Sequence, residues 1–364
     1  MGTNTDSAQY VIFSQPRGAD KSWSGEVDSK VGVQGTFKAN AMFSGTVQLL
    51  SKQNGDGNFT PGVEWAFAKA QLMPALALRV GRMGGPFFAV SDFRDVGYAN
   101  TWLRPPQDVY GQVPVSHFDG ADVILQTSIG SATLSTQLFG GQSKAVVQST
   151  DVDLKKLVGF NATLDMDGGI SLRVGHLQGK LTVHNAALNG LVATMRSVPV
   201  PGWSAVADQL DPNNKKATFS GIGASVDEGN WIANFEYTMR RTDTYVPDTD
   251  GWYVTLGHRF GKFTPYATVS QLKQKSGNVD NNAPAPTPQL AGLKGAVAAT
   301  LSGQTRNQKT MAVGLRWDAY RNLAVKGQFE RIKPNGNGLF VQTQPGFGTG
   351  ASVNVYSLAV DMVF

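Results

Sequence analysis

Residues 352–364 read SVNVYSLAVDMVF, and this last stretch of the chain decides the fold. A large apolar side chain stands at positions 356, 358, 360, 362 and 364, with smaller, polar or charged residues between them. A period of two predicts a β-strand with one apolar face. A soluble domain seldom ends on such a strand, because a bare apolar edge invites aggregation. In a barrel closed in lipid the last strand pairs with the first. We therefore predict a closing barrel strand here rather than an ordinary edge strand.

The composition excludes several classes of protein. The chain has 364 residues and no Cys, which rules out disulfides and thiolate metal sites. It contains no run of eighteen apolar residues, so a helical membrane protein is excluded. A net charge of +5 is too small and too dispersed to indicate nucleic-acid binding. The start, Met1-Gly2 followed by TNTDS, lacks the pattern of a signal peptide and suggests a mature or engineered start.

The alternation continues backwards along the chain. It predicts fifteen clear strands between residues 30 and 364, and the apolar run YVIF at residues 10–13 as a sixteenth. An even number is typical of single-chain bacterial barrels. We predict an all-β fold: a transmembrane antiparallel up-and-down β-barrel of about 16 strands, formed by residues 1–364 as one domain.

The connections between these strands alternate in length. Long loops are predicted at residues 84–116, 178–216, 274–306 and 333–350, a further loop at 140–155, and tight turns after most of the other strands. Short periplasmic turns opposite long extracellular loops are the outer-membrane pattern. A soluble sandwich or propeller gives no reason for this asymmetry. Aromatic residues near strand ends fit interfacial girdles: Trp65, Trp231, Trp252, Phe260, Trp317, Phe329, Tyr356 and Phe364.

The positions between the outward apolar residues should line the lumen. By this parity the inward basic residues are Lys30, Arg79, Arg173, Arg240, Arg259, Arg316 and Lys326, and the inward acidic residues are Glu64, Asp122, Glu236, Glu330 and Asp361. These charges either pair with one another and keep water in the pore, or form a transverse field with the loop after the fifth strand. The charged candidates on that loop are Asp92, Arg94, Asp95, Arg104 and Asp108, and Pro105-Pro106 should stiffen it.

Three features resemble the general porins of Gram-negative bacteria. They are the closing strand with its terminal Phe, the segment DSKVGVQGT at residues 28–36, and the long insertion after the fifth strand. Within that insertion, DVGYANTWLRPPQDVY at residues 95–110 resembles the inward-folded third loop of one porin branch at its Gly-Tyr, Trp, Arg-Pro-Pro and Val-Tyr positions. The resemblance covers about residues 28–364. The chain departs from it at the start, where porins have a long amphipathic first strand and this chain offers YVIF.

The resemblance implies a location and partners. We expect a trimeric, 16-stranded porin in the outer membrane of a Gram-negative bacterium, surrounded by lipid and lipopolysaccharide. The third loop should form the constriction, and Tyr356 and Phe364 should belong to the assembly signal of the closing strand.

The expected function is passive diffusion of small hydrophilic solutes and ions. Seven basic against five acidic lumen residues predict a mild preference for anions and carboxylates. A substrate-specific channel, a barrel enzyme and an adhesin acting through its long loops are the alternatives. The four histidines are scattered and no catalytic or phosphate-binding motif is present, so we predict no enzyme activity, cofactor or metal.

Overall fold

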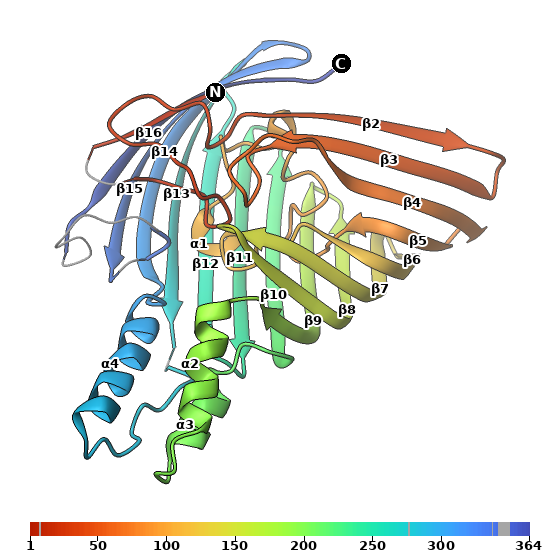
Figure 1. Ribbon diagram of the computed structural model, residues 1–364. Coiled ribbons are helices and arrows are strands. Elements are labelled where there is room, and N and C mark those ends of the chain that lie inside the picture. The colour runs from red at the N-terminus through yellow and green to blue at the C-terminus, as the bar shows by residue number, and fades with distance from the viewer. Residues whose placement is uncertain (7–8, 276, 337, 341–349) are drawn as a thin grey trace.

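In the computed structural model, which describes all residues except 7–8, 276, 337 and 341–349, the chain forms one curved antiparallel sheet of sixteen strands (Figure 1). The strands are β1 Gly2–Thr5, β2 Lys30–Lys38, β3 Phe43–Lys52, β4 Gly62–Met73, β5 Leu76–Gly84, β6 His117–Ile129, β7 Ala132–Val147, β8 Thr150–Met166, β9 Ile170–Val183, β10 Lys215–Glu228, β11 Trp231–Thr242, β12 Thr249–His258, β13 Phe263–Gln274, β14 Asn307–Tyr320, β15 Leu323–Asn335 and β16 Val353–Met362. The predicted fold class is thus confirmed, with its strand number.

Each strand from β3 to β15 pairs with both of its neighbours in sequence, and β2 pairs with β3, which is the up-and-down topology that the alternation predicts. The closing strand β16 pairs with β15 along its length and with β1 from Gly2↔Leu358 to Thr5↔Val355. Strands β1 and β2 stand at the two ends of the strand order, and no ladder joins them within the described residues. On its other edge β1 pairs with residue Ser24 of the first loop.

The identity of the first strand differs from the prediction. The polar residues GTNT form β1, whereas the YVIF run lies in the loop between β1 and β2. Tyr10 and Val11 of that run are buried, and Tyr10 packs with Phe340, Val353 and Val355 inside the barrel. Its apolar character therefore reflects burial between the first loop and strands β15 and β16, not contact with lipid.

The outer face of the sheet is apolar. On β16, Leu358, Val360 and Met362 are 57–59% exposed, while Ala359 and Asp361 between them are at most 6% exposed. Each strand from β2 to β16 has at least nine residues, the length that a tilted strand needs to cross a bilayer. A continuous apolar surface of this extent fits lipid rather than water.

Connections at one end of the sheet are short and those at the other end are mostly long. The short ones, at residues 39–42, 74–75, 130–131, 167–169, 229–230, 259–262 and 321–322, define the turn end, and the opposite end is the loop end. Two predicted loops are more regular than expected. Residues 140–155 form the tops of β7 and β8, and β9 continues to Val183.

Three helices project from the loop end (Figure 1): α2 Ala186–Arg196, α3 Trp203–Leu210 and α4 Pro288–Ser302. The side chain of Asn185 caps α2 and that of Thr287 caps α4. Trp203, Met195 and Val297 share a small apolar core, so the loop after β9 and the loop after β13 pack on each other. Among the described residues, no helix has the length and apolar character needed to cross a bilayer.

A β-bulge in the β3–β4 pair changes which side chains of β4 point into the lumen. The register between β3 and β4 shifts at Gln48/Leu49, so that Gln48 faces Trp65 and Leu49 faces Val63. Phe67 then falls on the lumen side, where the Arg79 guanidinium lies 5.1 Å from its ring centroid. Trp65, two residues before it and tilted against it, shares this side, so the prediction of Trp65 as an outward girdle residue is wrong.

Candidate functional site inside the barrel

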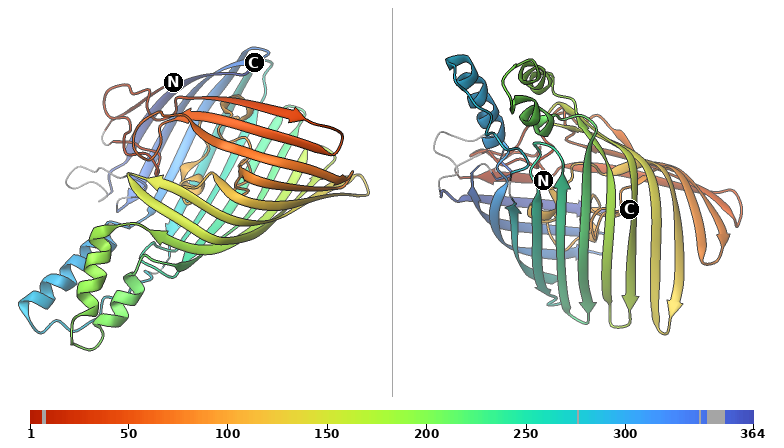
Figure 2. Two further views of the ribbon diagram at one scale, coloured as in Figure 1. Left: turned by 45° about the vertical axis from the view of Figure 1, so that its right-hand side comes forward. Right: turned by 90° about the horizontal axis from the view of Figure 1, so that it is seen from below.

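The segment between β5 and β6, residues 85–116 and here called loop 3, folds into the barrel and crosses to the opposite wall (Figure 2). It contains the 3-10 helix η1 Gly97–Ala99 and the short helix α1 Gln107–Tyr110. Helix α1 contacts β11 to β14, and η1 contacts β16.

Aromatic side chains hold the apolar side of loop 3. Phe88 stacks on Tyr110 at 4.5 Å between ring centroids and meets Phe219 of β10 edge-on at 5.2 Å. Trp102 packs edge-on against Tyr253 of β12, and its Nε1 donates to Thr255 Oγ1 at 2.7 Å. These rings belong to the largest apolar cluster of the described residues, so loop 3 is part of the core.

Basic residues of the wall hold the polar side of loop 3. Lys326, which is 0% exposed, donates from Nζ to the carbonyl oxygens of Gly97, Asn100 and Trp102 at 2.7, 2.7 and 2.9 Å. It also pairs with Asp361 at 3.0 Å. This lysine therefore caps carbonyl groups that would otherwise be buried without a donor.

Three arginines act in the same way from other strands. Arg316 donates to the Tyr98 and Asn100 carbonyls at 2.7 and 3.0 Å. Arg173 donates to the Pro86 carbonyl at 2.6 Å and Arg240 to that of Gln112 at 2.7 Å. The predicted basic wall is thus largely a set of anchors for the loop backbone.

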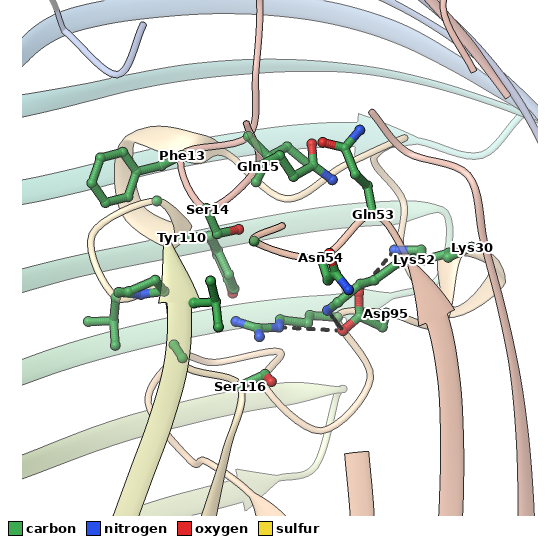
Figure 3. Close-up of a pocket in the computed structure, with 18 of the residues that line it drawn as sticks. Phe13, Ser14, Gln15, Lys30, Lys52, Gln53, Asn54, Asp95, Tyr110 and Ser116 are labelled. Carbon is green, nitrogen blue, oxygen red and sulfur yellow. Dashed lines mark hydrogen bonds and ion pairs between the residues drawn. The ribbon is translucent and has the colours of Figure 1, made fainter. Parts of the chain in front are cut away.

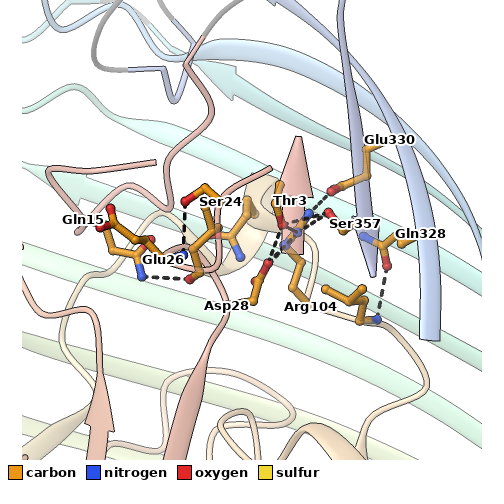
Figure 4. Close-up of polar contacts among 12 residues, drawn as sticks. Thr3, Gln15, Ser24, Glu26, Asp28, Arg104, Gln328, Glu330 and Ser357 are labelled. Carbon is orange, nitrogen blue, oxygen red and sulfur yellow. Dashed lines mark hydrogen bonds and ion pairs between the residues drawn. The ribbon is translucent and has the colours of Figure 1, made fainter. Parts of the chain in front are cut away.

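Arg104 is the centre of a buried ionic cluster (Figure 4). Its guanidinium, 3% exposed, donates to Asp28 at 2.7 and 3.0 Å and forms an ion pair with Glu330. It also donates to Thr3 Oγ1 at 3.1 Å and Ser357 Oγ at 2.5 Å. One side chain therefore joins loop 3 to the first loop, β1, β15 and β16. Burial opposes ionisation of Asp28, but the Arg104 charge outweighs it and lowers the pKa of that carboxyl.

Two close approaches require glycine. A Cβ on Gly97 would lie 2.2 Å from Asp361 Oδ1, and a Cβ on Gly251 of β12 would lie 2.3 Å from Gln112 Nε2. Both glycines stand where loop 3 touches the wall, so a side chain at either position would push the loop away from the wall.

Asp108 does not face an open passage. It is 1% exposed, its Oδ2 accepts from the Ser270 hydroxyl, and its Oδ1 has no partner within the described residues. Burial raises the pKa of the Asp108 carboxyl to about 6.

A cavity of about 830 Å³, here called the vestibule, lies between loop 3, the first loop and strands β2, β3 and β5 to β8 (Figure 3). At its wall Asp95 of loop 3 lies 2.8 Å from Lys52, 3.4 Å from Lys30 and 3.7 Å from Arg94. Burial alone would raise the pKa of Asp95, but the charges of Lys52, Lys30 and Arg94 hold it well below its usual range. Three cations around one carboxylate leave an excess of positive charge there.

The other predicted residues lie apart from this cluster. Arg79 binds Asp122 through both carboxylate oxygens, and Gln137 also donates to Asp122 at 2.6 Å. Arg79 is therefore neutralised by a direct partner. Asp92 lines a second cavity of about 270 Å³ together with Arg173 and Gln137, toward the turn end.

Two predicted acidic residues of the wall contact loop 3 or the first residue of the strand that follows it. Glu236 accepts from the Ala89 amide at 2.9 Å and from the Tyr110 hydroxyl at 3.1 Å, so it is a further anchor of loop 3. Glu64 lies 3.7 Å from the ring of His117.

One prediction needs correction, and another is not tested by the structure. Arg259 follows the end of β12 in the turn at residues 259–262 and binds Asp227 at 2.6 and 2.7 Å, so it lies at the turn-end rim and not on the lumen wall. Phe364 lies beyond the end of β16 with its side chain fully exposed, while Tyr356 packs on Phe329 on the outer face. The role of Tyr356 and Phe364 in assembly stays a prediction.

Sequence reasoning missed two important residues. Lys52 stands opposite Lys30 in the β2–β3 register, and the period-two pattern of β3 would have placed it in the lumen if extended past Leu50. Asp28 lies outside the alternating segments, and no local pattern marks it as the partner of Arg104. Within the described residues no three His, Asp or Glu side chains are grouped to hold a metal.

No protein-family description matches the chain, and no curated protein sequence is similar to it. Solved structures of outer-membrane channels share its architecture. The anion-selective porin of Comamonas acidovorans is 13% identical with a TM-score of 0.56, covering 100% of this chain and 97% of that one. OmpF of Salmonella typhi, solved with daunomycin, is 13% identical with a TM-score of 0.59, covering 100% and 96%. The outer-membrane channel DcaP of Acinetobacter baumannii is 9% identical with a TM-score of 0.54, covering 100% and 96%. The chain therefore has the fold of the Gram-negative outer-membrane porins.

Proposed function

We propose that this protein is a porin-type channel of a Gram-negative outer membrane, through which small hydrophilic solutes and ions diffuse. The observation that carries this proposal is loop 3, which is fixed inside the barrel on one wall and leaves the vestibule open along the other. An apolar outer face around a polar, partly open interior fits passage of water-soluble molecules across lipid.

In this proposal loop 3 is the constriction. Its aromatic contacts and its ionic anchors come from strands on the far wall, so the loop cannot swing out without exposing buried charge. The passage is then bounded by Asp95 and Arg94 on the loop and by Lys30 and Lys52 on the wall.

The excess positive charge around Asp95 gives the channel a mild preference for anions. Charges in a narrow, low-dielectric opening act on passing ions before salt screens them, over a distance of about 8 Å at physiological ionic strength. Asp56, Asp151 and Asp153 also line the vestibule and oppose this effect, so the preference is small. Arg79 contributes little because Asp122 neutralises it.

The decisive experiment is the reversal potential of single channels in a potassium chloride gradient. We expect wild type to favour chloride and Lys52→Glu to favour potassium. Lys262→Glu, which makes the same charge change in the turn at residues 259–262, is the matched control and should behave like wild type. A wild-type channel that favours potassium, or equal shifts in the two variants, would refute the selectivity, and absence of conductance would refute the channel itself.

A homotrimer is part of the proposal. One structure with this fold, of OmpT of Vibrio cholerae, is described as a trimer form, with 11% identity, a TM-score of 0.55, and coverage of 100% of this chain and 98% of that one. Mass determination by light scattering in detergent tests the assembly, and a monomer at micromolar concentration would count against it.

A further inference from the structure

A third cavity, at the loop end of the barrel, differs chemically from the vestibule and from the cavity lined by Asp92. It has a volume of about 260 Å³, and the lumen faces of β8, β9 and β10 line it with apolar side chains. The main ones are Val152, Leu154, Leu177, Leu181, Val183 and Phe219. A water-filled barrel interior is normally polar, so an apolar wall indicates an apolar occupant. Loop 3 covers part of this wall, where Leu154, Leu177 and Phe219 pack in its aromatic cluster, and the remainder borders the cavity.

Two guanidinium groups line the same cavity, and neither has a carboxylate partner. Arg240 donates to the carbonyls of Gln112 and Pro247, at 2.7 and 2.9 Å, and its buried Nε has no partner among the described residues. Arg306 donates to the Gly303 carbonyl at 3.2 Å and to Gln304 Oε1 at 3.3 Å, among other neutral oxygens.

No acidic side chain of the described residues forms an ion pair with Arg240 or Arg306. Within the described residues neither arginine forms an ion pair, and none of residues 7–8, 276, 337 and 341–349 is acidic in sequence. Asp248, an acidic residue whose charge acts on Arg240 without forming an ion pair with it, accepts from the Thr242 amide at 2.8 Å and lies 3.9 Å from Arg241. Burial lowers the pKa of Arg306 to about 10, so the group stays charged at pH 7.

The cavity adjoins the vestibule. Phe13, Val113 and Pro114 line both spaces. The Arg306 guanidinium lies 5.2 Å from the centroid of the Phe13 ring, which places this cation beside the shared border.

We propose that this cavity binds a small aromatic carboxylate, with the ring against the β8–β10 wall and the carboxylate between Arg240 and Arg306. An apolar cavity of about 150 Å³ is enough for benzene, so the larger volume here accommodates a ring with its carboxylate. Carboxylates form short, charge-assisted hydrogen bonds with guanidinium groups. The ring of the ligand would displace water that the apolar wall binds poorly. The protein thus selects molecules that combine an apolar body with one negative charge.

The test is isothermal titration of the full chain in lipid nanodiscs with benzoate, with empty nanodiscs as the blank. Benzamide has the ring without the charge, and acetate has the charge without the ring. We expect benzoate to bind at least tenfold more tightly than either one, which is the size of effect expected from one hydrogen bond to a charged group.

Two variants test the assignment of the two halves of the site. Arg306→Gln should weaken benzoate binding about tenfold, and Arg321→Gln, in the exposed turn at residues 321–322, is the control of equal charge that should bind as wild type does. Leu181→Asn should weaken benzoate binding through the wall, and it serves if Arg306→Gln fails to fold. The proposal is overturned if wild type does not bind benzoate, if benzamide binds equally well, or if either variant keeps wild-type affinity. Because binding needs no ion flow, this result is independent of the channel proposal.

Discussion

Arg104→Met is the substitution with the clearest consequence. Methionine keeps much of the length of the side chain and removes its charge, which leaves the carboxylates of Asp28 and Glu330 buried without their shared partner. Both carboxylate side chains are only 6% exposed. Removing one member of a buried ion pair typically costs about 3–5 kcal/mol, because the remaining charge stays desolvated.

The cost should appear in the free energy of unfolding. We expect Arg104→Met to lower it by about 3–5 kcal/mol, measured by urea unfolding in phospholipid vesicles followed by tryptophan fluorescence. The triple variant Arg104→Met, Asp28→Asn, Glu330→Gln carries no unpaired charge and should regain more than half of that loss. A loss below about 1 kcal/mol in the single variant, or a triple variant less stable than the single one, would refute the reasoning that buried charge dominates this cluster.

Two further predictions concern the contacts of loop 3. Because burial raises the pKa of Asp108 from 3.8 to about 6, the folded state binds the extra proton between these values, so stability should fall as pH rises from about 4 to 6 and then level off. Asp108→Asn should remove this slope in unfolding measurements across that range and gain up to about 3 kcal/mol at pH 7; an unchanged slope would contradict the assignment. Gly97→Ala places a methyl group 2.2 Å from a carboxylate oxygen of β16 and should displace η1, lower the unfolding midpoint and alter single-channel conductance, whereas Gly35→Ala, with no atom within 4 Å, should change neither. Equal effects of the two alanines would show that loop 3 is not seated against that strand.

Much of the fold could be predicted because barrel strands carry their own signal. The alternation on β16 survives in the structure as alternating exposure, and the unequal connections appear as a turn end and a loop end. The errors have local causes. The YVIF run is apolar because it is buried inside the barrel, and Trp65 faces the lumen because a bulge shifts parity by one residue.

The candidate site was only partly predictable. Parity gave the direction of Lys326, Arg316 and Arg173, but their partners are backbone carbonyls of loop 3, which no sequence pattern marks. The cations around Asp95 include Lys52, which the parity argument had overlooked, and the transverse field itself stays a proposal.

The sequence by itself determined the class of fold, the fifteen strands from β2 to β16 and most of the faces that meet lipid, because these depend on period-two patterning within short segments. Only the tertiary structure decided which charged side chains bind loop 3 and which line the vestibule. The physical reason is that ion pairs such as Arg104 with Asp28 and Glu330 join residues 76 and 226 positions apart. The partners of these charged residues depend on the curvature of the sheet and on the position of loop 3 inside it. The same curvature brings Arg240 and Arg306 to one apolar cavity.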